Sequence, residues 1–306
     1  MKSFTRSLFL ALALTTGAWV QAQTFEQSFA ALERKDYRTA FAGFKKLAEQ
    51  GAAGAQFNLG LMYRTGQGVP QDDQQAVAWY RKAAEQGQAM AQSNLGLMYH
   101  TGQGVPKDEQ QAVVWYRKAA EQGDAGAQFN LGNMYHTGQG VRKDEQQAVA
   151  WYRKAAEQGN ADAQFNLGNM YDNGRGVRKD EQQAVAWFRK AAVQGNASAQ
   201  YNLGVMYDNG QGVRKDEQQA VEWSRKAAEQ GHVKAQINLG WRYVEGRGVA
   251  KDEQMAYFWW VLASAQGNQD AAKLRDLVGS DLSPEQRAAA QASARNWQPK
   301  IAEQFR

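Results

Sequence analysis

Few residues in this sequence combine a reactive type with a catalytic spacing. The chain of 306 residues contains three histidines, His100, His136 and His232, and no cysteine. Zero cysteine excludes disulfides, thiolate metal sites and cysteine nucleophiles. His100 and His136 are 36 residues apart, and we expect them to occupy equivalent positions on packed helices, roughly 10 Å from each other. Two ligands of one metal cannot be that far apart, so we predict no metal site and no cofactor.

Carboxylates and glycines give no stronger catalytic signal. Asp172 and Asp208 are also 36 residues apart, and catalytic carboxylate pairs need a closer approach than neighbouring helices provide. The segment Gly66-Gln67-Gly68 follows a predicted helix, whereas a phosphate-binding loop follows a strand and opens a helix. We therefore predict no catalytic residues.

The element that positions these residues is a unit of 36 residues, first seen in Ala52–Gly87. It recurs five more times without insertion or deletion, so residues 52–267 hold six copies. Asn58 and Trp79 each begin a column of six identical residues at this spacing. A fixed period of this length indicates stacked supersecondary units, each of which buries its apolar face only against its neighbours.

Each unit is predicted to contain two helices. Ala55, Leu59 and Met62 recur at the three- and four-residue spacing of one helix face, and Gly66 can end that helix in the left-handed conformation. A second helix is expected to begin at Asp72 or Asp73 and to end at Gly87. The residues expected on its buried face are Ala76, Trp79 or Tyr80, Ala83 and Ala84. This pattern predicts an all-α fold.

These residues resemble the Sel1-like repeats, which are related to the tetratricopeptide repeats. The family pattern is A-x-x-x-L-G-x-x-Y-x-x-G-x-G-V followed by A-x-x-W-Y-R-K-A-A-E-Q-G. In the first unit it is filled by Ala55, Leu59, Gly60, Tyr63, Gly66, Gly68, Val69, Ala76, Trp79, Ala83, Ala84 and Gly87. The resemblance implies a right-handed α-solenoid that binds other proteins and whose first helices line its concave side.

The first 22 residues have the pattern of a secretory signal peptide. Lys2 and Arg6 precede the apolar run Leu8–Leu14, and small residues precede a cleavage site at Ala22. The run is too short to span a bilayer comfortably, so we expect cleavage near Ala22, no stable membrane insertion afterwards, and a periplasmic or secreted protein. Without Lys2 and Arg6, 34 basic and 31 acidic side chains remain. A net charge of +3 does not indicate nucleic-acid binding.

Residues 23–51 are expected to cap the first unit. Phe25–Arg34 is predicted to form one helix, and Asp36–Gly51 aligns with the second helix of a repeat, with Phe44 at the tyrosine position and Gly43 at the tryptophan position. Repeat arrays need atypical ends to cover their terminal apolar faces.

Residues 268–306 are expected to form the other cap. The basic pair seen at Arg81-Lys82 recurs in units one to five but becomes Val261-Leu262 in the sixth, so this surface must be covered. We predict one helix over residues 269–278 and a second that begins at a capping box, Ser283 to Gln286. The side chains expected against the apolar surface are Leu274, Leu277 and Trp297.

Comparison among the six copies separates stacking positions from recognition positions. The Asn58 column is expected to hydrogen-bond a neighbouring turn or helix end, and the Trp79 column to pack between repeats. Columns that vary on the first helix are free for recognition. They provide the candidate partner-binding residues Phe57, Leu61, Arg64, Ser93, His100, Phe129, Asn133, His136, Phe165, Asn169, Asp172, Tyr201, Asp208 and Trp241.

The sequence thus predicts an exported, non-enzymatic scaffold of the bacterial envelope that binds a protein or peptide along its concave face. A cell-wall or β-lactam hydrolase is an alternative, and it would need a nucleophile and a base in one cleft. A glycan-binding or host-contact factor is another, and it would expose aromatic rings in a row. The partner and the oligomeric state are left open.

Overall fold

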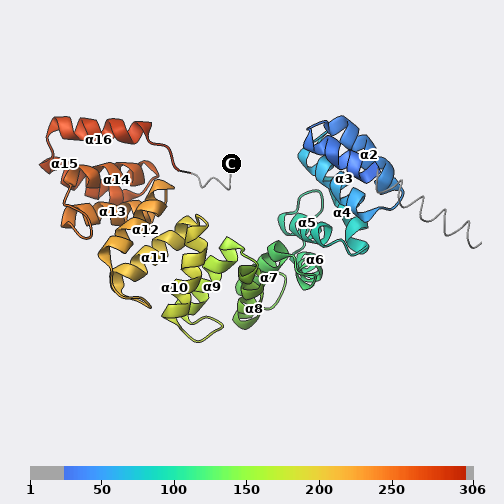
Figure 1. Cartoon of the computed structure of the whole chain (residues 1–306), viewed down its shortest axis with the longest axis horizontal. Coiled ribbons are helices and arrows are strands. Elements are labelled where there is room, and N and C mark those ends of the chain that lie inside the picture. The colour runs from blue at the N-terminus through green and yellow to red at the C-terminus, as the bar shows by residue number, and fades with distance from the viewer. Residues whose placement is uncertain (1–23, 301–306) are drawn as a thin grey trace, which may run out of the picture. The chain divides into compact units, whose positions relative to one another are not determined.

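The computed structural model describes residues 24–300. The expected signal peptide and residues 301–306 lie outside the described residues. All regular elements of the described range are helices (Figure 1), and none of them is long and apolar enough to cross a membrane. The chain divides into two compact parts, an N-terminal half that ends at Asp144 and a C-terminal half that begins at Glu145. The prediction of an all-α repeat solenoid is confirmed.

Each repeat contributes two helices of 13 residues, called here the A helix and the B helix. The A helices are α3 (Ala53–Thr65), α5 (Ala89–Thr101), α7 (Ala125–Thr137), α9 (Ala161–Asn173), α11 (Ala197–Asn209) and α13 (Val233–Glu245). The B helices are α4 (Asp73–Glu85), α6 (Glu109–Glu121), α8 (Glu145–Glu157), α10 (Glu181–Val193), α12 (Glu217–Glu229) and α14 (Glu253–Ala265). Residues 24–33, α2 (Tyr37–Glu49), α15 (Gln269–Asp281) and α16 (Pro284–Asn296) flank them.

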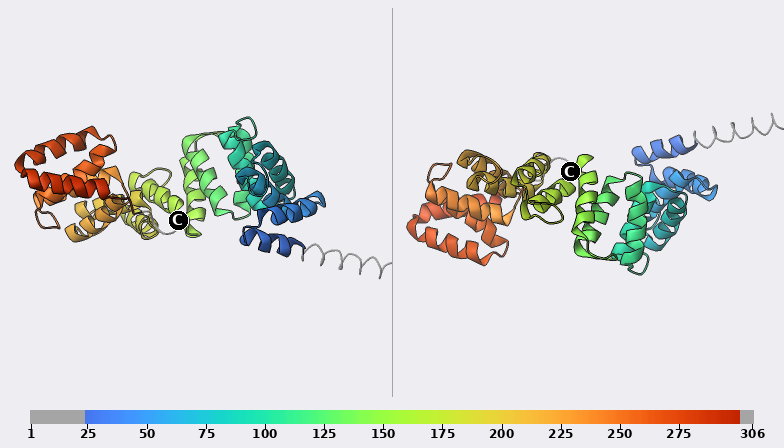
Figure 2. Two further views of the ribbon diagram at one scale, coloured as in Figure 1. Left: turned by 90° about the horizontal axis from the view of Figure 1, so that it is seen from above. Right: turned by 90° about the horizontal axis from the view of Figure 1, so that it is seen from below.

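Local sequence signals set the helix ends in the first repeat. Helix α3 ends at Gly66, whose φ of 70° is left-handed and whose amide donates to the Met62 carbonyl. Helix α4 begins after Asp72, whose side chain accepts the amide of Gln75 at 2.9 Å. Within each half, A and B helices then pack side by side as successive hairpins (Figure 2).

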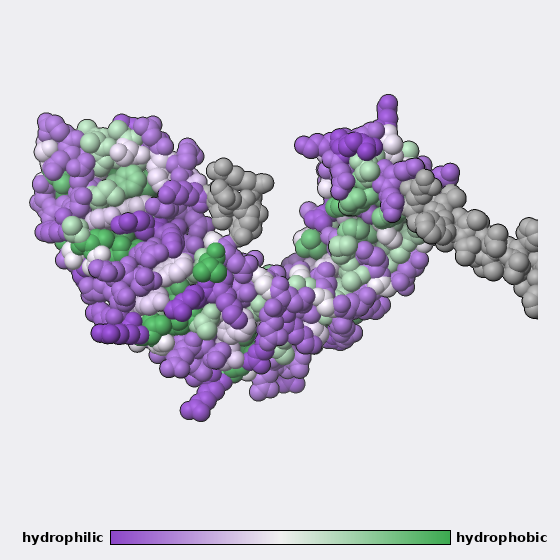
Figure 3. Space-filling view, in the orientation of Figure 1, coloured by the Kyte–Doolittle hydropathy of each residue, from purple (hydrophilic) through white to green (hydrophobic). Residues whose placement is uncertain are grey.

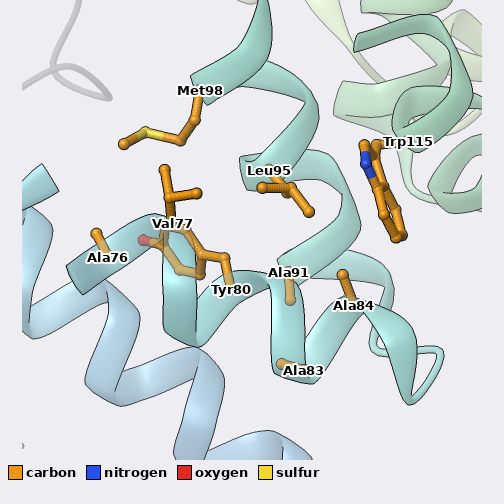
Figure 4. Packing of buried hydrophobic residues seen from close by; sticks show 9 residues of the cluster. All are labelled: Ala76, Val77, Tyr80, Ala83, Ala84, Ala91, Leu95, Met98 and Trp115. Atoms are coloured by element: carbon orange, nitrogen blue, oxygen red, sulfur yellow. The ribbon is translucent and has the colours of Figure 1, made fainter. Parts of the chain in front are cut away.

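The apolar core forms between each hairpin and the next one. Figure 4 shows this packing for α4 and α5, where Tyr80 lies among Val77, Leu95 and Met98. Tyr80 is fully buried, and burial raises the pKa of its phenol to about 12. A Cβ added at Gly60 would lie 2.7 Å from the Tyr80 ring, so only glycine permits this approach of α3 to α4. Of the two rings considered from sequence, Tyr80 is therefore the core residue.

The tryptophan beside it occupies the edge of the core. Trp79 is half-buried and packs against the cluster of the preceding hairpin, as predicted for this column. The Lys82 ammonium lies 4.0 Å from its ring centroid, and the equivalent lysine covers the tryptophan in repeats 2 to 5 at 3.8–4.2 Å. The neighbouring Arg81 donates to the Tyr99 hydroxyl at 2.8 Å. Arg81 therefore joins adjacent repeats, whereas Lys82 covers the tryptophan of its own helix.

A buried glutamine makes a main-chain hydrogen bond that recurs between consecutive repeats. Gln56 Nε2 donates to the Ala48 carbonyl of α2 at 3.2 Å, and its Oε1 accepts from Gln86 Nε2 at 2.7 Å. Asn58 Nδ2 instead donates to Gly54 within its own helix at 2.8 Å. The predicted bond to a neighbouring helix end is therefore not made by the Asn58 amide nitrogen, whereas Asn94 of the same column accepts from Arg64 in the last turn of α3. The column at residues 56, 92, 128, 164, 200 and 236 is glutamine throughout and buried throughout. Gln56 and Gln92 donate to last-turn carbonyls that also accept the amide of the following glycine.

The N-terminal flanking helices extend the repeat pattern. Phe44 of α2 is fully buried at the tyrosine position. A Cβ at Gly43 would collide with the Ser28 side chain, because the helix of residues 24–33 crosses α2 at this point. The short turn at Lys35 adopts a left-handed φ of 62°.

Helices α15 and α16 both pack on α14. Leu274 packs against the cluster of Tyr257 and Trp260, and Trp297 against the cluster of Trp259 and Leu262. The capping box at Ser283 is present, with Pro284 as the first residue of α16. Two details differ from the prediction: α15 continues to Asp281, and Leu277 is 67 % exposed on the outer side of that helix.

Candidate functional site

The candidate residues lie on the A helices, and we call their surface the A-helix face. In the N-terminal half they are Phe57, Leu61 and Arg64 on α3, Ser93 and His100 on α5, and Phe129, Asn133 and His136 on α7. In the C-terminal half they are Phe165, Asn169 and Asp172 on α9, Tyr201 and Asp208 on α11, and Trp241 on α13. All are half-buried except Trp241, which is 40 % exposed. A partner can therefore reach the face, although part of each side chain is buried against the protein itself.

The aromatic members of the face pack against other rings, Phe57 and Phe165 on the B helix of the same repeat and Tyr201 on the residue that caps the next A helix. The centroids of Phe57 and Tyr80 are 5.9 Å apart, and those of Phe165 and Phe188 are also 5.9 Å apart. Tyr201 stacks on His232 at 4.9 Å. Such contacts fix the rings and contribute to the core, so these three residues offer a partner only part of their surface.

Polar members of the face meet across repeats in the N-terminal half. Arg64 of α3 donates from Nη1 to Asn94 Oδ1 of α5 at 3.0 Å. Ser93 donates to the Asp124 carboxylate, which caps α7, at 3.3 Å. Arg64 and Ser93 therefore each reach the next repeat, where their partners are an invariant asparagine and a helix-capping aspartate.

His100 forms the clearest acid–base contact on this face. Its Nδ1 lies 2.6 Å from Glu109 Oε2, and Lys107 also binds Glu109 at 2.9 Å. Burial raises the pKa of Glu109, but the hydrogen bonds from Lys107 and His100 outweigh it and hold that pKa below its usual range. The adjacent Thr101 hydroxyl donates to the Leu97 carbonyl at 2.9 Å. The His100–Glu109 contact links an A helix to the B helix of the same repeat.

The C-terminal half holds a polar cluster that sequence reasoning missed. Asp208 accepts from Arg242 at 2.9 Å and from Arg247 at 2.6 Å. Arg242 is only 3 % exposed, and its Nε and Nη1 atoms are buried without a hydrogen-bond partner. The available signal was the column at residues 62, 98, 134, 170 and 206, which is methionine in five repeats and arginine in the sixth. A charge at a core position requires a buried counter-charge, and Asp208 supplies it.

The A-helix face of the C-terminal half also carries a side chain–side chain amide contact. Asn202 Nδ2 donates to Asn169 Oδ1 at 3.2 Å, which connects α11 to α9. In the space-filling view, apolar patches alternate with hydrophilic surface and form no single continuous apolar area (Figure 3). Among residues 24–300, no group of three or more histidine, aspartate and glutamate side chains is arranged to hold a metal ion.

Comparisons with known proteins agree with the repeat geometry. The chain is similar to a Sel1 repeat protein of Oxalobacter formigenes, with 36 % identity over 78 % of this chain and 96 % of that one, and a TM-score of 0.71. It is also similar to a protective antigen of uropathogenic Escherichia coli with an SLR fold, at 29 % identity over 95 % of each chain and a TM-score of 0.39. No curated protein matches the chain.

The family comparison covers most of the described residues. The profile of the Sel1 repeat matches residues 53–88, 89–124, 125–160, 161–196, 197–232 and 233–268. These six matches coincide, within one residue, with the six copies found from the sequence. The chain therefore belongs to the Sel1 repeat family.

Proposed function

We propose that this protein is an exported, non-enzymatic scaffold that binds a protein partner along the A-helix face. Sel1 repeat proteins are in general protein-interaction scaffolds. The observation that carries the proposal is that variable residues of one A helix reach the next A helix, where Arg64 and Asn169 bond Asn94 and Asn202 of the invariant asparagine column. Side chains that vary while the invariant stacking columns are kept can be selected for a partner without loss of stacking.

Site-specific photo-crosslinking tests this proposal directly. A photo-reactive residue is placed at Asn169 on the A-helix face, and in a matched variant at Ala186, which is exposed on the B helix α10. We expect crosslinks to one dominant envelope protein from position 169 and none from position 186. Equal crosslinking from both positions, or crosslinking from position 186 alone, would contradict the proposed face.

Export is supported by the pattern of residues 1–22 and can be tested independently. Intact-mass measurement of the protein recovered from the periplasmic fraction should give a chain that begins at Gln23. Recovery of the uncleaved chain from the cytoplasm would refute export without affecting the proposed binding face.

The non-enzymatic part of the proposal rests on the structural roles of the acid–base groups. The His100–Glu109 contact and the Asp208 cluster each join neighbouring helices. We expect purified protein to hydrolyse neither nitrocefin nor peptidoglycan above the rate of a buffer blank. Turnover that is lost on His100→Gln substitution would overturn this part of the proposal.

A further inference from the structure

The segment that follows α16 docks on the end of a B helix in the C-terminal half. The Lys300 amide donates to the Glu229 carbonyl of α12 at 2.8 Å, and Lys300 Nζ lies 2.9 Å from the Glu229 carboxylate. A Cβ added at Gly231, in the turn after α12, would lie 3.8 Å from the Trp297 ring and 4.0 Å from Pro299. Residues 297–300 thus bind by one ring, one main-chain hydrogen bond and one ion pair.

The apolar part of this contact replaces a feature of the other repeats. Trp297 packs against the cluster that contains Trp259 and Leu262. In repeats 1 to 5 a lysine occupies the position of Leu262 and covers the tryptophan ring. In repeat 6 the lysine is absent, and Trp297 joins the cluster around the tryptophan. The tryptophan at the edge of the core between two repeats can therefore pack against an added aromatic side chain.

An equivalent surface, on which no segment of residues 24–300 lies, recurs at the ends of α2, α4 and α8. A Cβ at Gly51, Gly87 or Gly159 would meet no atom within 4 Å. Each of these turns follows a helix that ends in an exposed glutamate, which is equivalent to Glu229. Each turn also precedes a repeat of the same half of the chain in which a lysine covers the tryptophan. The three sets are Glu49 with Trp79, Glu85 with Trp115, and Glu157 with Trp187. Helix ends also present carbonyls that no intrahelical amide satisfies.

We infer that the ends of α2, α4 and α8 bind extended segments of a partner protein in which an aromatic residue is followed, three residues later, by lysine or arginine. The ring takes the place of the lysine over the tryptophan, the backbone donates to the helix-end carbonyl, and the basic side chain pairs with the glutamate. An exposed lysine–tryptophan contact is worth about 0.5–1 kcal/mol, so its displacement is a small cost. This inference rests on the proposed function, because it names the chemistry of the partner.

Fluorescence anisotropy with a labelled peptide of residues 295–301, RNWQPKI, tests the inference on the full chain at 0.15 M salt. We expect saturable binding that weakens at least about tenfold in the variant E49K/E85K/E157K. The matched variant E26K/E33K/D281K makes the same change in net charge at three other exposed positions, and it should change the affinity less than about twofold. Peptides with Trp297→Ala or Lys300→Glu should also bind at least about tenfold more weakly.

Stoichiometry gives a second, independent readout. Because Trp297 holds the chain's own segment on α12, the W297A variant should bind one additional peptide per chain in isothermal titration. The inference would be overturned by an unchanged stoichiometry, by an equal loss of peptide affinity in both charge variants, or by equal affinity for the peptides with and without tryptophan. Concentration-dependent dimerisation that W297A abolishes would also overturn it, since the occupant would then be a second copy of this chain. Crosslinking from Asn169 without peptide binding would refute this inference and leave the proposed function standing.

Discussion

In repeats 1 to 5 the B helix carries an arginine that bonds the tyrosine of the next repeat and a lysine that covers a tryptophan. In repeat 6 the same two positions hold Val261 and Leu262, and α15 and α16 pack over them. The backbone of α14 is nevertheless a helix of the same length as its five counterparts. The comparison shows that the same helix backbone presents a polar surface to the next repeat or an apolar surface to the cap, according to its side chains.

Repeat 6 differs from the others inside the core as well. Trp260 occupies the core position that is tyrosine in repeats 1 to 3, Phe188 in repeat 4 and Ser224 in repeat 5, and it donates from Nε1 to the Ile237 carbonyl at 3.1 Å. Arg242 replaces the core methionine and pairs with Asp208. A larger ring and a buried charge are both accommodated because each acquires a polar partner, as buried polar groups require.

The largest expected effect concerns the core of repeat 6. Trp260→Ala should lower the free energy of unfolding by about 3–5 kcal/mol, because Trp260 is 2 % exposed and packs between α14 and α15. Leu277→Ala is the matched change on the exposed side of the cap and should cost less than about 0.5 kcal/mol. Urea denaturation monitored by circular dichroism measures both. Similar losses in the two variants would show that the cap is not anchored through Trp260.

Removal of the Asp208 carboxylate should destabilise the chain less, and by an amount that depends on whether Arg242 is present. Asp208→Asn should destabilise the wild-type chain by about 3 kcal/mol, because it leaves Arg242 buried without its carboxylate. In an Arg242→Met background, which restores the methionine of the other repeats, the same change should cost less than about 1 kcal/mol. A double-mutant cycle from urea denaturation measures the difference. Additive losses would mean that Arg242 and Asp208 are not energetically coupled.

The smallest expected effect is a pH dependence specific to repeat 6. His232 caps α13 by accepting the Ala235 amide at 3.2 Å, whereas the equivalent caps in repeats 4 and 5 are Asn160 and Asn196. Burial, with a contribution from Lys234, lowers the pKa of His232 below its usual value. The unfolded chain therefore takes up the proton first, and stability is lost as the pH falls below about 6.5.

His232→Asn should remove this pH dependence. Because protonation abolishes the cap, the wild type should lose up to about 1 kcal/mol relative to the variant between pH 7.5 and pH 5. Thermal unfolding at both pH values measures this difference. Parallel losses in the two proteins would show that another group governs the acid sensitivity.

Much of the architecture follows from repetition in the sequence. The period of 36 residues, the helix-ending glycine at Gly66 and the cap at Asp72 predicted the helix pairs to within a residue or two. The substitution of the basic pair by Val261-Leu262 predicted that a cap would cover the sixth repeat. These inferences succeeded because helix ends and apolar periodicity depend on residues close together in the chain.

The structure decided the questions that depend on residues far apart in the chain. Periodicity placed Trp79 and Tyr80 equally well on the buried face, and only the packing of α4 on α3 selects Tyr80. The sequence showed that both the asparagine and glutamine columns are invariant, but not that Gln56 makes the inter-repeat bonds. Leu277 was assigned to the wrong side of α15 for the same reason.

The sequence by itself determined the helices, their number per repeat and the family, since local spacing and repetition are encoded directly in residue order. Only the tertiary structure decided that Arg242 pairs with Asp208 and that Trp297 and Lys300 return to α12. These two ion pairs join residues 34 and 71 positions apart in the chain (242 − 208 and 300 − 229), and their geometry exists only once the helices have packed.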